Sequence, residues 1–260
     1  EFTGKDSKLH KQLQSQSSEK EIYISRTGIP FDDGSVKKNY SELYEKWLLK
    51  DIQHHKKHLD MADLYGKSIA YTNLGVVYSM LGSEYMNEAI LCHQKALSFA
   101  MDARDTNIEI ISATNLGLCL IKNSQCVEAI EICNRALNLL KGTKESVPIT
   151  LNNTENLTKG RITTPILATS NGLPKNSFRA INCIILLLLG NANGELNNFE
   201  KSTEFYEQAF ESAKVYQLHE VAEVAKINLG VARGNRAYKL RLTNVALNLN
   251  PNMNPQEILA

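Results

Sequence analysis

Residues 70–100, AYTNLGVVYSMLGSEYMNEAILCHQKALSFA, contain the pattern on which much of the chain is built. Apolar and small side chains recur at helical spacing both before and after Gly82-Ser83. This periodicity predicts two helices separated by a tight turn. The small residues Gly75, Ala89 and Ala96 leave room for a partner helix to come close, and bulkier neighbours fill the remaining space.

The same pattern recurs along the chain. Asn115-Leu116-Gly117 begins 42 residues after Asn73, and the pair Leu189-Gly190 is followed 40 residues later by Leu229-Gly230. On the second helix of the first three copies, the equivalent positions hold His93, Cys133 and Tyr206. The fourth copy has a second helix that is about three residues short and ends near Ala246-Leu247. One such hairpin cannot bury its own apolar face, so we expect the copies to stack in sequence.

These residues resemble tetratricopeptide repeats of the long variety, as in the Leu-Gly-Asn spindle-orientation adaptors and rapsyn-like scaffolds. The resemblance lies in the Asn-Leu-Gly triplets, the small residues of each second helix and the stretch His55-Lys56-Lys57-His58-Leu59, and it covers residues 40–141 and 176–251. It implies an all-α, right-handed superhelical solenoid of antiparallel helix pairs.

The predicted organisation has five parts. A helix is expected from about Val36 to Tyr65, and Pro148, Pro165 and Pro174 mark a loop inserted between the second and third full copies. This loop could cover the groove as a lid, but an exposed tether is the favoured interpretation. The parts are an irregular lead-in at 1–35, repeats at 36–141, the loop at 142–175, repeats with a capping helix at 176–251, and a tail at 252–260.

Composition excludes several classes of function. The net charge is +1, which gives no global attraction to nucleic acid or to acidic membranes. No segment is long and apolar enough to span a bilayer, and no apolar leader is visible. The five cysteines are dispersed through predicted helices, which favours a reduced, cytoplasmic location.

No motif predicts an enzyme or a cofactor. The sequence contains no glycine-rich phosphate loop, nucleophile elbow or kinase set. His54 and His58 have a zinc-like spacing but lack a third ligand, so we interpret this stretch as helix packing. Cys119, Cys126 and Cys133 are separated by a turn at 123–125, and we expect them to be apolar fillers on two antiparallel helices.

The remaining candidate is a partner-binding groove on the concave side of the solenoid. Asparagine recurs one repeat apart, and its amide can satisfy the unpaired N–H and C=O groups of an extended peptide. In the adaptors that the chain resembles, matching asparagines grip extended partner segments, which implies this role for Asn73, Asn115 and Asn228; the third copy departs from the pattern with Leu188. The predicted groove residues are Asn73, Val76, Met80, Asn115, Leu118, Lys122, Leu188, Asn191, Asn228, Val231 and Asn235.

A basic patch follows the last Asn-Leu-Gly triplet. Between residues 226 and 241 the chain has five basic residues and no acidic one: Lys226, Arg233, Arg236, Lys239 and Arg241. Such a face would attract an acidic partner segment, although a capping repeat also has to show a polar side to water. Nucleic acid is not an expected partner, because no base-stacking or groove-reading module is recognisable.

The repeats and the groove favour two functions. The first is a non-enzymatic adaptor that binds an extended or helical segment of a partner protein. The alternative is an architectural subunit of a cytoskeletal or ciliary, microtubule-associated assembly.

Overall fold

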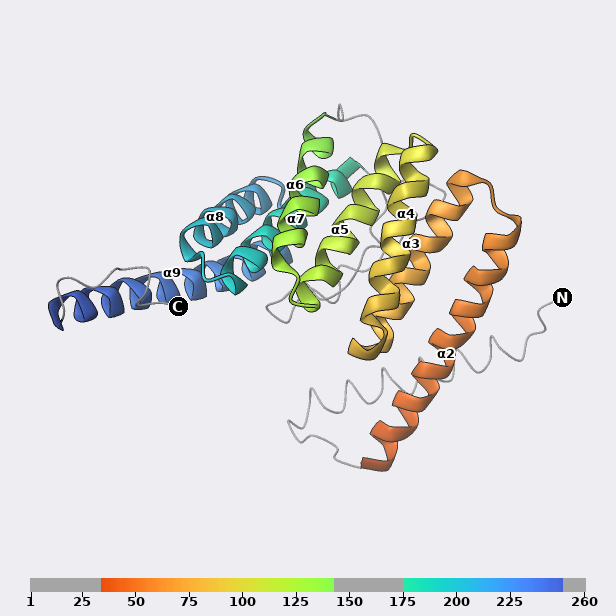
Figure 1. Ribbon diagram of the computed structural model, residues 1–260, viewed down its shortest axis with the longest axis horizontal. Coiled ribbons are helices and arrows are strands. Elements are labelled where there is room, and N and C mark those ends of the chain that lie inside the picture. Colours follow the sequence, from red (N-terminus) through yellow and green to blue (C-terminus); the bar gives the residue numbers. More distant parts are fainter. Residues whose placement is uncertain (1–33, 143–174, 250–260) are drawn as a thin grey trace. The chain divides into compact units, whose positions relative to one another are not determined.

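The computed structural model describes residues 34–142 and 175–249 (Figure 1). These residues form eight α-helices and one 3-10 helix and contain no strand, so the all-α prediction is confirmed for them. The chain divides into two units, residues 1–46 and 47–260, and the described part of the first unit is the beginning of helix α2. The predicted lead-in, inserted loop and tail fall almost entirely outside the described residues.

The helices follow one another with short connections. Their bounds are α2 Gly34–Met61, α3 Leu64–Leu81, η1 Ser83–Tyr85, α4 Met86–Asp102, α5 Thr106–Lys122, α6 Cys126–Gly142, α7 Lys175–Glu195, α8 Phe199–Val215 and α9 His219–Leu249. Three helices begin at a side-chain cap. The carboxylate of Asp105, for example, accepts hydrogen bonds from the N–H groups of Asn107 and Ile108 at 3.0 and 2.9 Å.

The helix predicted from Val36 to Tyr65 is shorter than expected at its C-terminal end. It ends at Met61, and α3 begins at Leu64. Asp63 caps α3 by accepting a hydrogen bond from the Gly66 N–H at 2.8 Å. The prediction missed this break because an aspartate N-cap without a glycine or proline leaves the apolar spacing on both sides intact.

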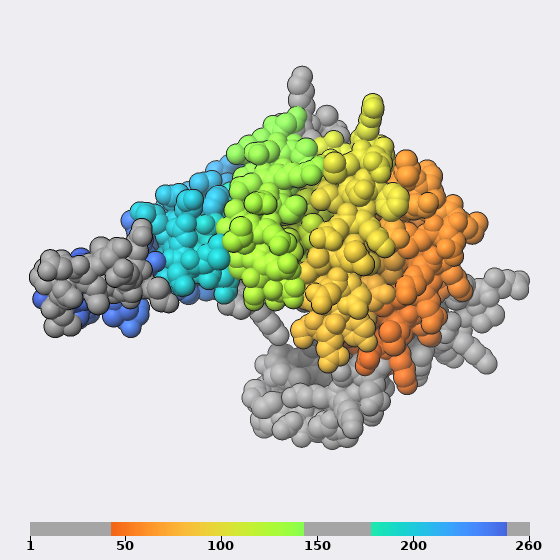
Figure 2. All heavy atoms as spheres, in the orientation of Figure 1, coloured from red at the N-terminus to blue at the C-terminus, as the bar shows by residue number. Residues whose placement is uncertain are grey.

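Within the second unit, each helix from α3 to α9 packs against the next one in the chain. Alternate helices also touch: α3 contacts α5, α5 contacts α7, and α7 contacts α9. Successive segments accordingly form adjoining bands in chain order on the face that Figure 2 shows. Helix α7 packs against both α5 and α6, so residues 143–174 interrupt the sequence without interrupting this order.

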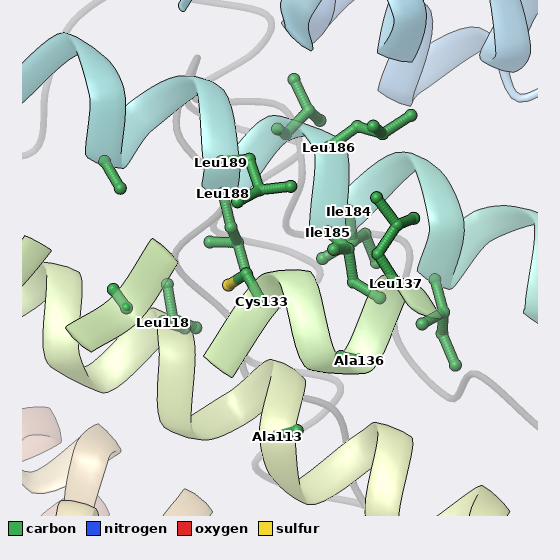
Figure 3. Packing of buried hydrophobic residues seen from close by; sticks show 14 of the residues in the cluster. Ala113, Leu118, Cys133, Ala136, Leu137, Ile184, Ile185, Leu186, Leu188 and Leu189 are labelled. Carbon is green, nitrogen blue, oxygen red and sulfur yellow. The ribbon is translucent and has the colours of Figure 1, made fainter. Parts of the chain in front are cut away.

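Helix α7 supplies the largest part of the core. Residues 183–190 are buried on every side of the helix, including Ile185 and Leu187 through Leu189 at 0% exposure. Figure 3 shows Ile184, Ile185 and Leu188 turned toward Cys133, Ala136 and Leu137 of α6, whereas Leu186 points away from that helix. A helix that is apolar all round must be covered all round, and here α5, α6, α8 and α9 provide the cover.

The first three copies share one contact between helices. A Cβ atom added to Gly75 would lie 2.6 Å from the His93 ring, and one added to Gly190 would lie 2.5 Å from the Tyr206 ring. At Gly117, the added atom would overlap the Cys133 sulfur. In each copy the side chain of the second helix therefore occupies the space that a Cβ would need.

The turn inside each of these copies places one residue at positive φ. Gly82, Ser124 and Asn197 each lie seven residues after the glycine of their copy, and their φ angles are 126°, 60° and 58°. The equivalent residue of the fourth copy is Ala237, which is helical. Alanine is rarely found at positive φ, because its Cβ clashes there.

The predicted second helix of the fourth copy is consequently wrong as a separate element. Helix α9 runs without a break for 31 residues, from His219 to Leu249. Neither glycine, asparagine nor serine stands at the position where the other copies turn.

Substitution of the core glycines tests the close helix contact. We expect Gly190→Ala to lower the free energy of unfolding by about 1–3 kcal/mol, because its Cβ would displace the Tyr206 ring. Gly142→Ala is the matched control, since no described atom lies within 4 Å of its added Cβ, and it should change stability by less than about 0.5 kcal/mol. Urea denaturation measures both, and equal effects would contradict the proposed packing.

The close contact at Gly75 buries the ionisable side chain of His93. Its side chain is fully buried, and neither ring nitrogen has a hydrogen-bond partner. Desolvation lowers the pKa of His93 to about 3, well below the ordinary value of 6.5. The folded protein therefore keeps this imidazole neutral.

Stability should fall in acid because of this residue. Below pH 6.5 the unfolded chain takes up a proton at His93 that the folded chain refuses, so the free energy of unfolding should fall by up to about 1.4 kcal/mol per pH unit, down to the folded pKa of about 3. His93→Cys, which copies the residue that the second repeat has at this position, should lose stability at neutral pH and remove this contribution to the slope. Exposed His219→Gln should retain it. Urea titrations between pH 7 and about pH 4 measure the difference, and parallel curves for wild type and His93→Cys would refute the assignment.

Candidate functional site

A cleft of about 760 Å³ lies among α5, α7, α8 and α9. Its floor and walls combine side-chain amides, a few apolar side chains and one residue of each charge. The lining residues are Leu118, Ile121, Lys122, Ser124, Asn191, Gly194, Glu195, Asn197, Phe199, Ser202, Tyr206, Asn228, Val231, Ala232 and Asn235. This is the size range of a site for a small molecule or for a few residues of a peptide.

The structure brings six of the eleven predicted groove residues to this cleft: Leu118, Lys122, Asn191, Asn228, Val231 and Asn235. They come from three helices that are distant in sequence. Their meeting follows from the contacts of α5 with α7 and of α7 with α9.

The other five predicted residues do not line the cleft. Val76, Asn115 and Leu188 are buried, and Asn115 is only 1% exposed, which leaves almost no surface for a partner. Asn73 is half-buried, whereas Met80 is exposed. Of the three equivalent asparagines, Asn73, Asn115 and Asn228, only Asn228 lines the cleft.

The amides of the cleft differ in how they are satisfied. The hydroxyl of Tyr206 donates to Oδ1 of Asn191 at 2.7 Å, which fixes that amide on α7. The Nδ2 group of Asn228 is buried and has no hydrogen-bond partner. A buried donor without an acceptor is costly, so a turn of this side chain toward an acceptor supplied by a ligand in the cleft would be favourable.

The charges of the cleft nearly balance. Lys122 and Glu195 are its ionisable residues with opposite charge, and both side chains reach the surface. Desolvation by the surrounding protein lowers the pKa of Lys122, and nearby Cys119 has a smaller opposite effect. This balance suits a neutral, hydrogen-bonding ligand surface better than a strongly charged one.

Several lining residues were not predicted from the sequence. Asn197, Phe199, Ser202 and Tyr206 come from the α7–α8 turn and from α8, whereas the predicted groove used only the first helix of each copy. The consecutive asparagines Asn197 and Asn198 could have indicated this part of the cleft from the sequence. Asn197 has a positive φ in the α7–α8 turn and Asn198 is the N-cap of α8, so both residues lie at the end of this helix pair.

The predicted basic patch is largely engaged in internal pairs. Arg233 and Arg236 of α9 form ion pairs with Glu207 and Glu200 of α8 at 2.7 and 2.9 Å. Lys239 donates to the Asn197 carbonyl at 3.1 Å, and Lys226 lies 3.7 Å from Glu223. These pairs join residues up to 42 positions apart, which is why the local sequence shows only the basic side.

We expect these ion pairs to contribute little stability. Arg233→Ala and Arg236→Ala should each lower the free energy of unfolding by less than about 1 kcal/mol, because both pairs are exposed and screened by salt. The effect should shrink further between low salt and about 0.5 M NaCl. Thermal unfolding at both salt concentrations measures it, and a large salt-independent loss would show that these side chains act through packing instead.

The thiols are held in their protonated form. Burial raises the pKa of Cys92 to about 11 and that of Cys119, Cys133 and Cys183 to about 12. Reactive cysteines need the opposite shift. Cys119 lies on α5 and Cys126 and Cys133 on α6, as predicted, and all five cysteines are buried.

In residues 34–142 and 175–249, no group of three or more His, Cys, Asp or Glu side chains is arranged to hold a metal ion. None of the helices described here combines the length and apolar character needed to cross a membrane. No family model and no curated protein sequence matches the chain.

Proposed function

We propose that the chain is a non-enzymatic adaptor with a tetratricopeptide-type α-solenoid, which binds an extended segment of a partner protein in the cleft among α5, α7, α8 and α9. The observation that carries the proposal is the unpartnered Nδ2 of Asn228 in a cleft rich in amides. A peptide carbonyl is the acceptor that such a donor lacks.

Two features of the fold support the solenoid. Alternate helices touch, and the glycines of three successive copies each receive a side chain from their own second helix. Stacked hairpins of this kind place their first helices on one side, where their exposed side chains can form a continuous groove.

The surroundings of Asn228 define the segment that the cleft would take. Asn191 and Asn235 are further amides, and Leu118, Val231 and Phe199 add apolar contacts. Backbone groups of an extended peptide would therefore be bound largely independently of sequence, and an apolar side chain would add selectivity. The near balance of Lys122 and Glu195 favours a peptide without high net charge.

A displayed library of peptides about 12 residues long, selected against the full chain, supplies the probe for a test. For a selected peptide, Asn228→Ala should weaken binding about 3- to 10-fold, and the double variant Asn228→Ala/Asn235→Ala more, since each amide contributes a hydrogen bond of about 0.5–1.5 kcal/mol. Asn134→Ala, an exposed asparagine of α6 outside the cleft, is the matched control. Fluorescence polarisation measures each Kd.

The peptide itself provides a second reading. N-methylation of single backbone amides should weaken binding at the residues held by the cleft, whereas side-chain changes at the same residues should matter less. Binding that ignores both the Asn228 change and N-methylation would overturn the proposal.

A further inference from the structure

A stripe of apolar side chains and glycines runs along the exposed side of α9. Val221, Ala225 and Leu229 are buried on the packed face, while Ile227, Tyr238 and Val245 are 53%, 65% and 49% exposed, Tyr238 at the rim of a pocket beside Phe199. Spacing of three, four and seven residues puts these three side chains on the same stripe as Gly230 and Gly234. No described atom lies within 4 Å of a Cβ added to either glycine.

The two glycines of this stripe resemble a pair of glycines on α7 that is covered by helix α8. Gly190 and Gly194 of α7 lie 40 residues before Gly230 and Gly234 and have the same spacing. Helix α8 packs there, with the Tyr206 ring over Gly190 and the Ser202 hydroxyl 3.3 Å from a Cβ added to Gly194. The element that fits such a pair of glycines is thus an antiparallel helix with a small residue followed four positions later by tyrosine.

Helix α9 contains that sequence itself. Gly234 and Tyr238 have the spacing of Ser202 and Tyr206. We propose that the exposed face of α9, formed by Ile227, Gly230, Gly234, Tyr238 and Val245, docks against the same face of a second copy of this chain, with the two α9 helices antiparallel about Gly234. In this register Tyr238 of each copy lies over Gly230 of the other, as Tyr206 lies over Gly190.

The charges at the ends of the stripe are complementary in this arrangement. Antiparallel pairing about Gly234 brings Glu223 near the N-terminal end of one helix to within about 6 Å along the axis of Arg241 of the other. The interaction occurs twice because the interface is symmetric. A contact confined to one helix face is at the small end of specific interfaces, so the dimer should be weak and concentration-dependent.

Sedimentation velocity of the full chain from about 1 to about 300 µM tests the proposal, because this range brackets the affinities of small interfaces. Wild type should shift from monomer to dimer across the series. Gly230→Leu should weaken dimerisation at least about 10-fold by filling the notch, without lowering the unfolding temperature, because it replaces a helical glycine with open space around it. Gly142→Leu, the same change at a helical glycine with no described atom near its added Cβ, should dimerise like wild type.

The register is tested by charge exchange and by crosslinking. Glu223→Arg and Arg241→Glu should each weaken the dimer, and the double variant should restore it, because exchange recreates both pairs. Gly234→Cys should crosslink to its counterpart with a short bis-maleimide, whereas Val215→Cys at an exposed position of α8 should not. A chain that stays monomeric at all concentrations, a dimer that is unaffected by Gly230→Leu, or charge variants without rescue would overturn the proposal.

Discussion

Close contact between two helices at a glycine is the constraint that sets the described structure. At Gly75, Gly117 and Gly190 the partner side chain occupies the place of a Cβ, so each hairpin has one distance and one register. The partner can be histidine, cysteine or tyrosine because the glycine sets the space and the rest of the core adjusts around it. His93 is the costliest of the three, since its ring nitrogens are buried without partners.

The cleft is a consequence of how these hairpins are joined. Contacts between alternate helices bring α5, α7 and α9 together, although residues 143–174 separate the first two in sequence. The side chains that line the cleft on this side are four amides, about as many apolar groups, and a single pair of opposite charges. Their neutrality distinguishes the cleft from the exposed ion pairs that join α8 to α9, where charge is already compensated within the chain.

Helix α9 behaves differently from the other first helices because of one residue. Ala237 replaces the turn residue of the earlier copies, so the chain continues as one helix and does not return over Gly230. The open space at Gly230 and Gly234 is therefore not filled by a second helix of the same copy, as it is in the other copies. The sequence analysis placed the start of the fourth copy at Asn228-Leu229-Gly230, but the hairpin expected after this triplet was wrong. A turn also requires a residue that tolerates positive φ.

Local sequence signals predicted the helical class and the Leu-Gly positions of the close contacts, because helical periodicity and small residues act over a few turns of the chain. They did not predict the break between α2 and α3 or the unbroken helix α9. Which predicted groove residues reach a common cleft was settled by tertiary packing alone. Asn115 and Asn228 occupy equivalent positions in their copies, yet one is buried between neighbouring helices and the other lines an open cleft near the end of the described helices. The burial of a side chain depends on how many helices pack around it. The local sequence pattern does not indicate how many there are.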